Sequence, residues 1–162
     1  MSKVHLTRRG YDTLQEELRR LKARERVKVA EDIKVARAHG DLSENAEYHA
    51  AKERQAHLEA RIRLLEDKLA RAEVVDLQTL SCDRVRFGTT VVLENLDSGE
   101  EVIYTLIGED EADVARGYLS ITSPIGRALI GKAVDDEVRI VVPSGTRMFE
   151  VRAIRKMDEA EG

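Results

Sequence analysis

Two carboxylates, Asp41 and Glu44, stand three residues apart in a chain of 162 residues. At the start of a helix, residues with this spacing can project on one side, so the pair could bind one divalent cation. Mg²⁺ takes six oxygen ligands and is usually held by one or two carboxylates together with waters and substrate phosphates. The pair therefore predicts half of a metal site, which a second active site would complete during phosphodiester chemistry.

The same spacing also has a purely structural interpretation. Asp41 as the N-cap of a helix, with Glu44 three residues later, would resemble a capping box, and the helix dipole favours both charges there. Gly40 suits the left-handed residue just past the end of a preceding helix. The residues alone leave both interpretations open.

Two long helices are expected to position the pair. Between residues 11 and 87 the chain contains one glycine, Gly40, and no proline. A first helix, capped by Thr7, is expected to run to about Ala38. Its apolar stripe slips in register at Glu25 and comprises Leu14, Leu18, Leu21, Val27, Ala30 and Ile33.

The segment after Gly40 has the seam of a coiled coil, with mainly apolar residues at alternating spacings of three and four. These positions are Tyr48, Ala51, Gln55, Leu58, Ile62, Leu65, Leu69 and Ala72. Two helices of about 30 residues joined by about four residues must run antiparallel. The sequence therefore predicts a slender hairpin with the carboxylates at its tip, and a dimerisation coiled coil is the simpler alternative.

The rest of the chain has short strands separated by turns. Strands are expected at Thr89–Asn95, Glu101–Leu106, Tyr118–Ile121, Glu137–Val142 and Arg147–Ile154, with a short helix between Ser123 and Gly131. We therefore predict an α+β protein with a helical hairpin at residues 1–76, a linker at 77–83 and a compact domain at 84–162.

Composition excludes several classes of protein. The 27 Lys and Arg residues nearly cancel the 31 Asp and Glu residues, and aromatic residues make up 4% of the chain. Net acidity argues against a coat for duplex DNA, and scarce aromatic residues argue against a row of base-stacking platforms. The chain has no apolar run that could span a membrane and no signal peptide, so a cytoplasmic protein is expected. The one cysteine, Cys82, cannot form an internal disulfide.

Other polar residues give weaker signals. His39 and His49 flank the tip but lack the further ligands that a zinc site needs. The acidic segment Glu109–Asp113 lacks the ligand spacing of a calcium loop and is expected to be solvated surface. The usual interpretation of basic residues on a coiled coil is a solvated face. Those of the hairpin include Arg37, Lys52, Arg54, Arg61 and Arg63.

The segment Gly40–Glu53, GDLSENAEYHAAKE, resembles the tip signature of the bacterial Gre transcript-cleavage factors. The resemblance extends over most of the chain, and its later stretches favour the GreA branch over the GreB branch. These further stretches are Leu6-Thr7…Gly10, Asn95–Ser98, Gly108–Asp113 and Ser123–Gly131. The resemblance implies that an FKBP-like domain without isomerase activity follows the coiled coil.

In this family the coiled coil enters the secondary channel of RNA polymerase and stimulates cleavage of backtracked nascent RNA near its 3′ end. The family's acidic pair, matched here by Asp41 and Glu44, helps to hold the second catalytic Mg²⁺ together with polymerase aspartates and orients the attacking water. Its basic patch for the RNA matches Arg37 and Lys52. The resemblance implies a factor that has no complete active site of its own and binds no metal stably alone.

Further residues are expected to support this role. Around the carboxylates, Leu42 is expected to pack at the tip, while Ser43 and Asn45 hold its geometry or contact substrate. The apolar stretch 121–130 is expected to dock on the rim of the polymerase channel, with Ser123, Pro124 and Ile125 as the candidate contacts. The expected partners are RNA polymerase and the nascent RNA, without a membrane, and the free protein is expected to be a monomer.

Other functions, with and without polymerase, stay open. A non-catalytic regulator of the polymerase channel would share the fold but have an altered acidic tip, and the Asp41 and Glu44 pair disfavours it. A free coiled-coil scaffold or a prolyl isomerase would act without polymerase.

Overall fold

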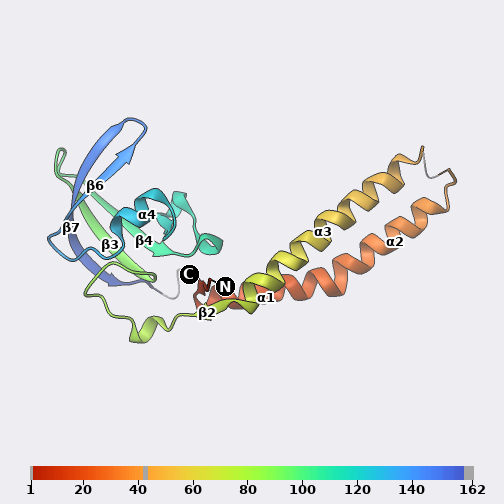
Figure 1. Ribbon diagram of the computed structural model, residues 1–162, viewed down its shortest axis with the longest axis horizontal. Coiled ribbons are helices and arrows are strands. Elements are labelled where there is room, and N and C mark those ends of the chain that lie inside the picture. The colour runs from red at the N-terminus through yellow and green to blue at the C-terminus, as the bar shows by residue number, and fades with distance from the viewer. Residues whose placement is uncertain (1, 42–43, 159–162) are drawn as a thin grey trace. The chain divides into compact units, whose positions relative to one another are not determined.

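The computed structural model describes residues 2–41 and 44–158, and it divides the chain into two units (Figure 1). The hairpin unit is built from Tyr11–Ala72, and the globular unit is built from Lys3–Gly10 together with the chain from Glu73 onward. The first unit is helical and the second contains the main sheet, so the protein is of the α+β type. No helix within the described ranges is long and apolar enough to cross a membrane.

The hairpin unit contains the two predicted helical segments. The first segment consists of α1 (Arg8–Arg20), a π-helical turn η1 (Leu21–Glu25) and α2 (Arg26–Arg37), and the second is α3 (Ala46–Ala70). Figure 1 shows α2 and α3 running side by side. The predicted seam of α3 is confirmed, since Ala51, Ile62 and Leu65 are buried and the other seam residues are half-buried. Ala72, the last predicted seam residue, lies beyond the end of the helix.

The predicted register slip coincides with the π-helical turn. A π turn bonds each residue to the fifth along the chain instead of the fourth, so it accommodates one extra residue. Eight residues therefore separate the buried Leu21 from the buried Val29, whereas two α turns hold about seven. The prediction that Val27 and Ala30 continue the stripe is wrong: Val29, Ile33 and Ala36 are the buried residues of α2, and Val27 is 65% exposed. Six residues separate Val27 from Ile33, which places their side chains about 120° apart around an α-helix.

Ion pairs join the two sides of the hairpin before, within and after the π turn. Arg61 donates to Glu17 at 2.8 Å, Lys22 to Glu66 at 2.9 Å, and Arg26 to Glu59 at 2.8 Å. The hydrogen bond from Arg61 lowers the pKa of the Glu17 carboxyl below its ordinary value, and the bond from Arg26 does the same for the pKa of Glu59. These ion pairs supplement the apolar seam between the two sides of the hairpin.

The globular unit contains a five-stranded sheet in the order β5-β4-β3-β7-β6. Its elements are β3 (Thr89–Asn95), β4 (Glu101–Ile107), β5 (Tyr118–Ser120), α4 (Pro124–Leu129), β6 (Glu137–Val142) and β7 (Gly145–Lys156). Both predicted hairpins are confirmed, because β3 pairs with β4 and β6 pairs with β7 in antiparallel register. Leu129 of α4 is fully buried with Leu93, Leu106 and Val151 of the sheet, and this cluster forms the core of the unit.

The first residues of the chain belong with the globular unit, which differs from the expected hairpin domain at 1–76. The strand β1 (Val4–Leu6) pairs with β2 (Ala72–Val74), and the Val75 N–H donates to the Leu6 carbonyl at 2.9 Å. Leu6 is fully buried. A β-strand satisfies its polar backbone only against a distant segment, so a local pattern of three residues did not indicate this placement.

The expected linker at 77–83 is also part of the packed structure. A short 3₁₀ helix, η2 (Leu77–Thr79), follows β2. Leu77 is buried in a cluster with Phe87, Ile107 and Met157, so apolar burial ties the start of this segment to the globular unit.

The π turn makes a testable prediction about deletions. Removing the exposed Arg24 shortens the spacing from Leu21 to Val29 from eight residues to seven. A continuous α-helix would then keep both side chains on one face. We expect the free energy of unfolding of this variant to stay within about 1 kcal/mol of the parent. Chemical denaturation followed by the helical circular dichroism signal measures it.

The matched control removes the exposed Ala56 from α3, which has no π turn. This deletion rotates Ile62 and Leu65 off the seam, and we expect a loss of at least about 3 kcal/mol, since burial of each such side chain contributes about 1.5–3 kcal/mol. Equal losses for the two deletions would contradict the explanation of the π turn.

Candidate functional site

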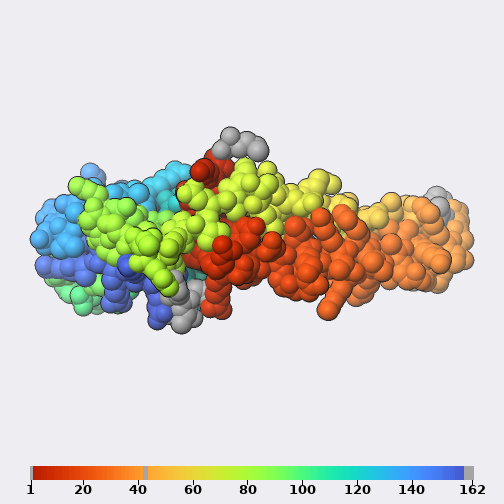
Figure 2. Space-filling view, turned by 90° about the horizontal axis from the view of Figure 1, so that it is seen from below, coloured from red at the N-terminus to blue at the C-terminus, as the bar shows by residue number. Residues whose placement is uncertain are grey.

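The hairpin tip, residues 38–45, connects α2 to α3. The residue after α2, Ala38, is still helical, and Gly40 has a φ of 115°, which favours glycine. Leu42 and Ser43, which were predicted to support the tip, lie outside the described residues. In Figure 2 the orange end of the hairpin, next to the tip, is open to solvent in this view.

Asn45 joins the two sides of the tip. Its Oδ1 accepts a hydrogen bond from the Tyr48 N–H at 3.1 Å, which makes Asn45 the N-cap of α3. Its Nδ2 donates to the Ala36 carbonyl at 2.5 Å, near the end of α2. One side chain therefore satisfies an amide at the start of one helix and a carbonyl at the end of the other, two kinds of group that helix ends leave without intrahelical partners.

The position of this cap decides between the two interpretations of the acidic pair. Because α3 begins after Asn45, Asp41 and Glu44 both precede the helix, and neither occupies an N-cap or a third helical position. The capping-box interpretation is therefore wrong. Both carboxylates belong to exposed residues outside regular structure.

The tip provides only part of a metal site. Carboxylate oxygens are the hard ligands that Mg²⁺ prefers, so Asp41 and Glu44 have donor chemistry suited to that cation. Two residues supply too few ligands for a complete site. Within residues 2–41 and 44–158, no group of three or more His, Cys, Asp or Glu side chains is arranged to hold a metal ion. The arrangement is suited to a cation that another molecule also binds.

The basic residues of the hairpin fall into two groups. Arg61 and Arg54 form ion pairs across the hairpin, with Glu17 at 2.8 Å and with Asp32 at 3.5 Å. Arg37 instead lies over the ring of Tyr48, 5.8 Å from its centroid, and the Lys52 amine donates to the Gln55 side chain at 3.1 Å. Among the residues that the structure describes, neither Arg37 nor Lys52 forms an ion pair with a carboxylate.

The two histidines beside the tip have separate environments. The Nδ1 atom of His39 lies 3.9 Å from a carboxylate oxygen of Glu47, and the His49 ring contacts the edge of Tyr48 with the ring centroids 5.5 Å apart.

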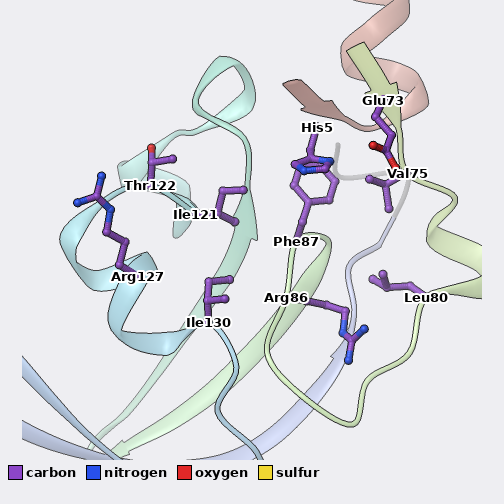
Figure 3. A pocket seen from close by; sticks show the side chains of 10 residues that line it. All are labelled: His5, Glu73, Val75, Leu80, Arg86, Phe87, Ile121, Thr122, Arg127 and Ile130. Atoms are coloured by element: carbon purple, nitrogen blue, oxygen red, sulfur yellow. The ribbon is translucent and has the colours of Figure 1, made fainter. Parts of the chain in front are cut away.

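A second candidate site is a cavity of about 450 Å³ in the globular unit (Figure 3). Its lining is mainly apolar and comprises His5, Glu73, Val75, Leu80, Arg86, Phe87, Ile121, Thr122, Arg127 and Ile130. Figure 3 shows the guanidinium groups of Arg86 and Arg127 pointing away from the centre of the cavity. The size and apolar lining are typical of a binding pocket.

The cavity uses neighbours of the predicted docking residues. Ser123 caps α4, since its hydroxyl accepts from the Gly126 N–H at 3.1 Å and donates to the Ser120 carbonyl at 2.6 Å. Ile125 packs against the core, whereas Pro124 is exposed. Ile121, Thr122, Arg127 and Ile130 of the same stretch line the cavity. Its other walls come from β1, β2 and the segment before β3, and no local sequence signal could have grouped them.

The fold and the tip together define a class of α+β proteins with two units, a helical hairpin that presents exposed carboxylates and a small globular unit with a five-stranded sheet. The chain belongs to the GreA/GreB family of transcription elongation factors. The family model "Transcription elongation factor, N-terminal" matches residues 4–74, and "Transcription elongation factor, GreA/GreB, C-term" matches residues 80–156.

Individual relatives agree with this assignment. The chain is 55% identical over 152 residues to the transcription elongation factor GreA of Trichlorobacter lovleyi, covering 94% of this chain and 96% of the relative. It is 54% identical over 152 residues to the protein of the same name from Pelobacter propionicus, with the same coverage. The expected resemblance to the GreA branch is thereby confirmed. A solved structure, GreA factor homolog 1 (Gfh1) of Thermus thermophilus, is 32% identical, with 94% of this chain and 99% of that chain covered and a TM-score of 0.45.

The two-sided role of Asn45 predicts graded effects on the hairpin. Asn45→Asp keeps an acceptor for the Tyr48 N–H but loses the donor to Ala36, whereas Asn45→Ala loses both. Since removal of an N-cap side chain costs about 0.5–2 kcal/mol, we expect Asn45→Ala to destabilise the hairpin by about that amount or more, and Asn45→Asp by less. Urea unfolding followed by circular dichroism measures both.

The control is Glu53→Ala on the exposed face of α3, for which a change within about 0.5 kcal/mol is expected. If Asn45→Asp is as stable as the parent protein, the bond to Ala36 has no role in closing the tip.

Proposed function

We propose that this chain stimulates the cleavage of backtracked nascent RNA by RNA polymerase and so rescues arrested transcription complexes. The observation that carries the proposal is the exposure of Asp41 and Glu44 outside both helices, at the tip of the hairpin, where neither caps a helix. Membership of a family of transcription elongation factors supports the setting of the reaction.

The hairpin is the part that would reach the polymerase active site. At 1.5 Å per residue, the 25 residues of α3 extend about 37 Å, and the hairpin is only two helices wide. Such a rod suits entry into the secondary channel. The two carboxylates would then act inside a catalytic centre that belongs to the polymerase, so the chain is a factor and not an enzyme by itself.

Asp41 and Glu44 would hold Mg²⁺ jointly with polymerase aspartates. The cation, when bound, supplies positive charge to the scissile phosphodiester and acidifies water. The carboxylate oxygens of this chain would accept hydrogen bonds from the attacking water and orient it. Two ligands are too few for stable binding of the cation to the free factor, so its site would form only in the complex.

Arg37 and Lys52 would bind phosphates of the extruded RNA 3′ segment. Their lack of a carboxylate partner among the described residues leaves their charge available, in contrast to Arg54 and Arg61. Contacts to phosphates carry no base information, so this binding would not depend on RNA sequence.

The globular unit would dock on the rim of the channel. We propose that Pro124 and the cavity beside α4 form its contact surface, in place of the hydroxyl of Ser123 and the side chain of Ile125, which are already engaged within the unit. An FKBP-like fold is the finer description that we propose for this unit, supported by its five-stranded, mainly antiparallel sheet and the short helix α4. A factor that acts on bacterial RNA polymerase would work in the cytoplasm, as a monomer when free.

The acidic pair makes the central prediction. In stalled complexes of polymerase, Asp41→Asn or Glu44→Gln should lower the maximal rate of RNA cleavage by about 100-fold or more, as expected for loss of a charged group at the reacting centre. The concentration of factor at half-maximal binding should change little. Glu47→Gln, which neutralises an exposed carboxylate in the first turn of α3, is the control and should cleave at the parent rate.

Cleavage at the parent rate by both tip variants would overturn the proposal. A parent protein that binds polymerase and only inhibits it would instead be a channel regulator. Prolyl-isomerase turnover, or a stable dimer in sedimentation without polymerase, would support a role that does not need polymerase.

The basic pair makes a separate prediction about affinity. Arg37→Gln and Lys52→Gln should each raise the half-saturating concentration for cleavage about fivefold, the equivalent of about 1 kcal/mol for an exposed charged contact. The difference from the parent should shrink at high salt, because screening weakens phosphate contacts. Titration of the factor at two salt concentrations measures both effects. Arg63→Gln, on the exposed side of α3, is the control, and an equal loss in this variant would show that the effect is not specific to the pair.

A further inference from the structure

Two motifs that carry the Gre resemblance have no part in the chemistry of the tip. These are Leu6-Thr7…Gly10 and the acidic stretch Gly108–Asp113. The structure brings them together within the globular unit. Glu111 ends the short helix η3 (Glu109–Glu111), and its Oε2 accepts from the Thr7 N–H at 3.1 Å while its Oε1 accepts from the Thr7 hydroxyl at 2.5 Å.

Gly10 completes this arrangement, which we name the Glu111 clamp and define by Thr7, Gly10 and Glu111. The Thr7 Oγ1 accepts from the Gly10 N–H at 2.9 Å and so caps α1. A Cβ atom on Gly10 would lie 2.4 Å from the Glu111 Cδ and 2.5 Å from its Oε1. Glycine inside a helix is unfavourable, and the close approach of the carboxylate explains why it is present.

The clamp is partly shielded from solvent. Thr7 is only 3% exposed and Gly10 is buried, while Glu111 is half-buried, so the bonds to its carboxylate are partly buried. Hydrogen bonds to an ionised acceptor are stronger than neutral ones, and a low local dielectric strengthens them further. The start of α1 also places its dipole toward this carboxylate, which is the favourable orientation for a negative charge.

The helix that the clamp holds is shared between the two units. Its first turn, up to Gly10, belongs to the globular unit, and its continuation from Tyr11 belongs to the hairpin unit. The strands β1 and β2 join the chain entering the hairpin to the chain leaving it. Glu111 adds a bond between the entering chain and the loop after β4, which belongs to the main part of the globular unit.

We propose that Glu111 is a positioning residue, whose carboxylate restricts the movement of the hairpin about the globular unit and so preorganises delivery of the tip. This role rests on the proposed function. If the hairpin samples fewer arrangements, a larger fraction of molecules is ready to bind, and the apparent affinity rises in proportion to that fraction. The tip carboxylates are unaffected, so the maximal cleavage rate is independent of the clamp.

The experiment compares Glu111→Gln, Gly10→Ala and the double variant Gly10→Ala/Glu111→Ala with the parent. Gly10→Ala is informative because alanine strengthens the helix itself while its Cβ displaces the carboxylate. Asp97→Asn, which changes an exposed carboxylate in the β3–β4 turn, is the control. Spin labels at Ala56→Cys and Glu100→Cys, with Cys82→Ser, report the distribution of distances between the units without polymerase.

We expect Glu111→Gln and Gly10→Ala to broaden that distribution and to raise the half-saturating concentration for RNA cleavage by about five- to tenfold, with the maximal rate unchanged. The double variant should be no worse than either single change, because residues that act through one contact are not additive. Asp97→Asn should match the parent in both measurements.

Several outcomes would contradict the proposed role of Glu111. These are an unchanged distance distribution in Glu111→Gln, a gain of affinity in Gly10→Ala as expected from helix propensity alone, or strictly additive losses in the double variant. A parent protein that fails to stimulate cleavage would contradict the proposed function. Because the distance measurement needs no polymerase, the role of Glu111 would still be tested by the distribution of distances between the spin labels.

Discussion

A hairpin of two helices can bury only one narrow apolar seam, and this constraint governs much of the structure. Full burial on the seam is limited to a few side chains, such as Ile62 and Leu65. Side chains elsewhere on the two helices meet water, so ion pairs such as Arg26 with Glu59 supplement the seam. A seam this thin also tolerates no error of register, because a single extra residue in a helix would turn the next apolar side chains by about 100°. The π turn at Leu21–Glu25 absorbs that residue.

At the tip, different residues provide stability and candidate chemistry. The amide of Asn45 bonds to both helices with its oxygen and its nitrogen. Since one side chain closes the tip, Asp41 and Glu44 are not required as caps and stay exposed. A carboxylate held by a helix terminus would be stabilised in its charged form but poorly placed to bind a cation from another molecule. The division of roles between neighbouring residues therefore makes an incomplete metal site compatible with a stable hairpin.

The globular unit shows how distant segments combine. Its core follows from alternating patterns in β3, β4, β6 and β7, with Leu129 of α4 closing it. The cavity beside α4 and the bonds between Thr7 and Glu111 both draw on residues from the two ends of the chain. Neither arrangement has a counterpart in any local pattern, since Thr7 and Glu111 are 104 residues apart and the cavity combines residues as distant as His5 and Ile130. Both depend on β1, a strand of three residues that local patterning did not predict.

The sequence by itself determined the helical hairpin, the seam of α3, the position of the tip, the strands of the main sheet and both of its hairpins. These features arise from hydrophobic periodicity and from turn residues, which act over a few neighbouring positions. It also indicated Asp41 and Glu44, although their spacing alone favoured helix capping over a metal-binding role. Only the tertiary structure decided that Asn45 is the cap, that Val29 replaces Val27 on the seam, and that residues 3–10 belong to the globular unit. The deciding interactions are a hydrogen bond across the tip, the packing of a helix face and the pairing of two strands. Each joins residues on separate elements, so a pattern along one element carries no information about it.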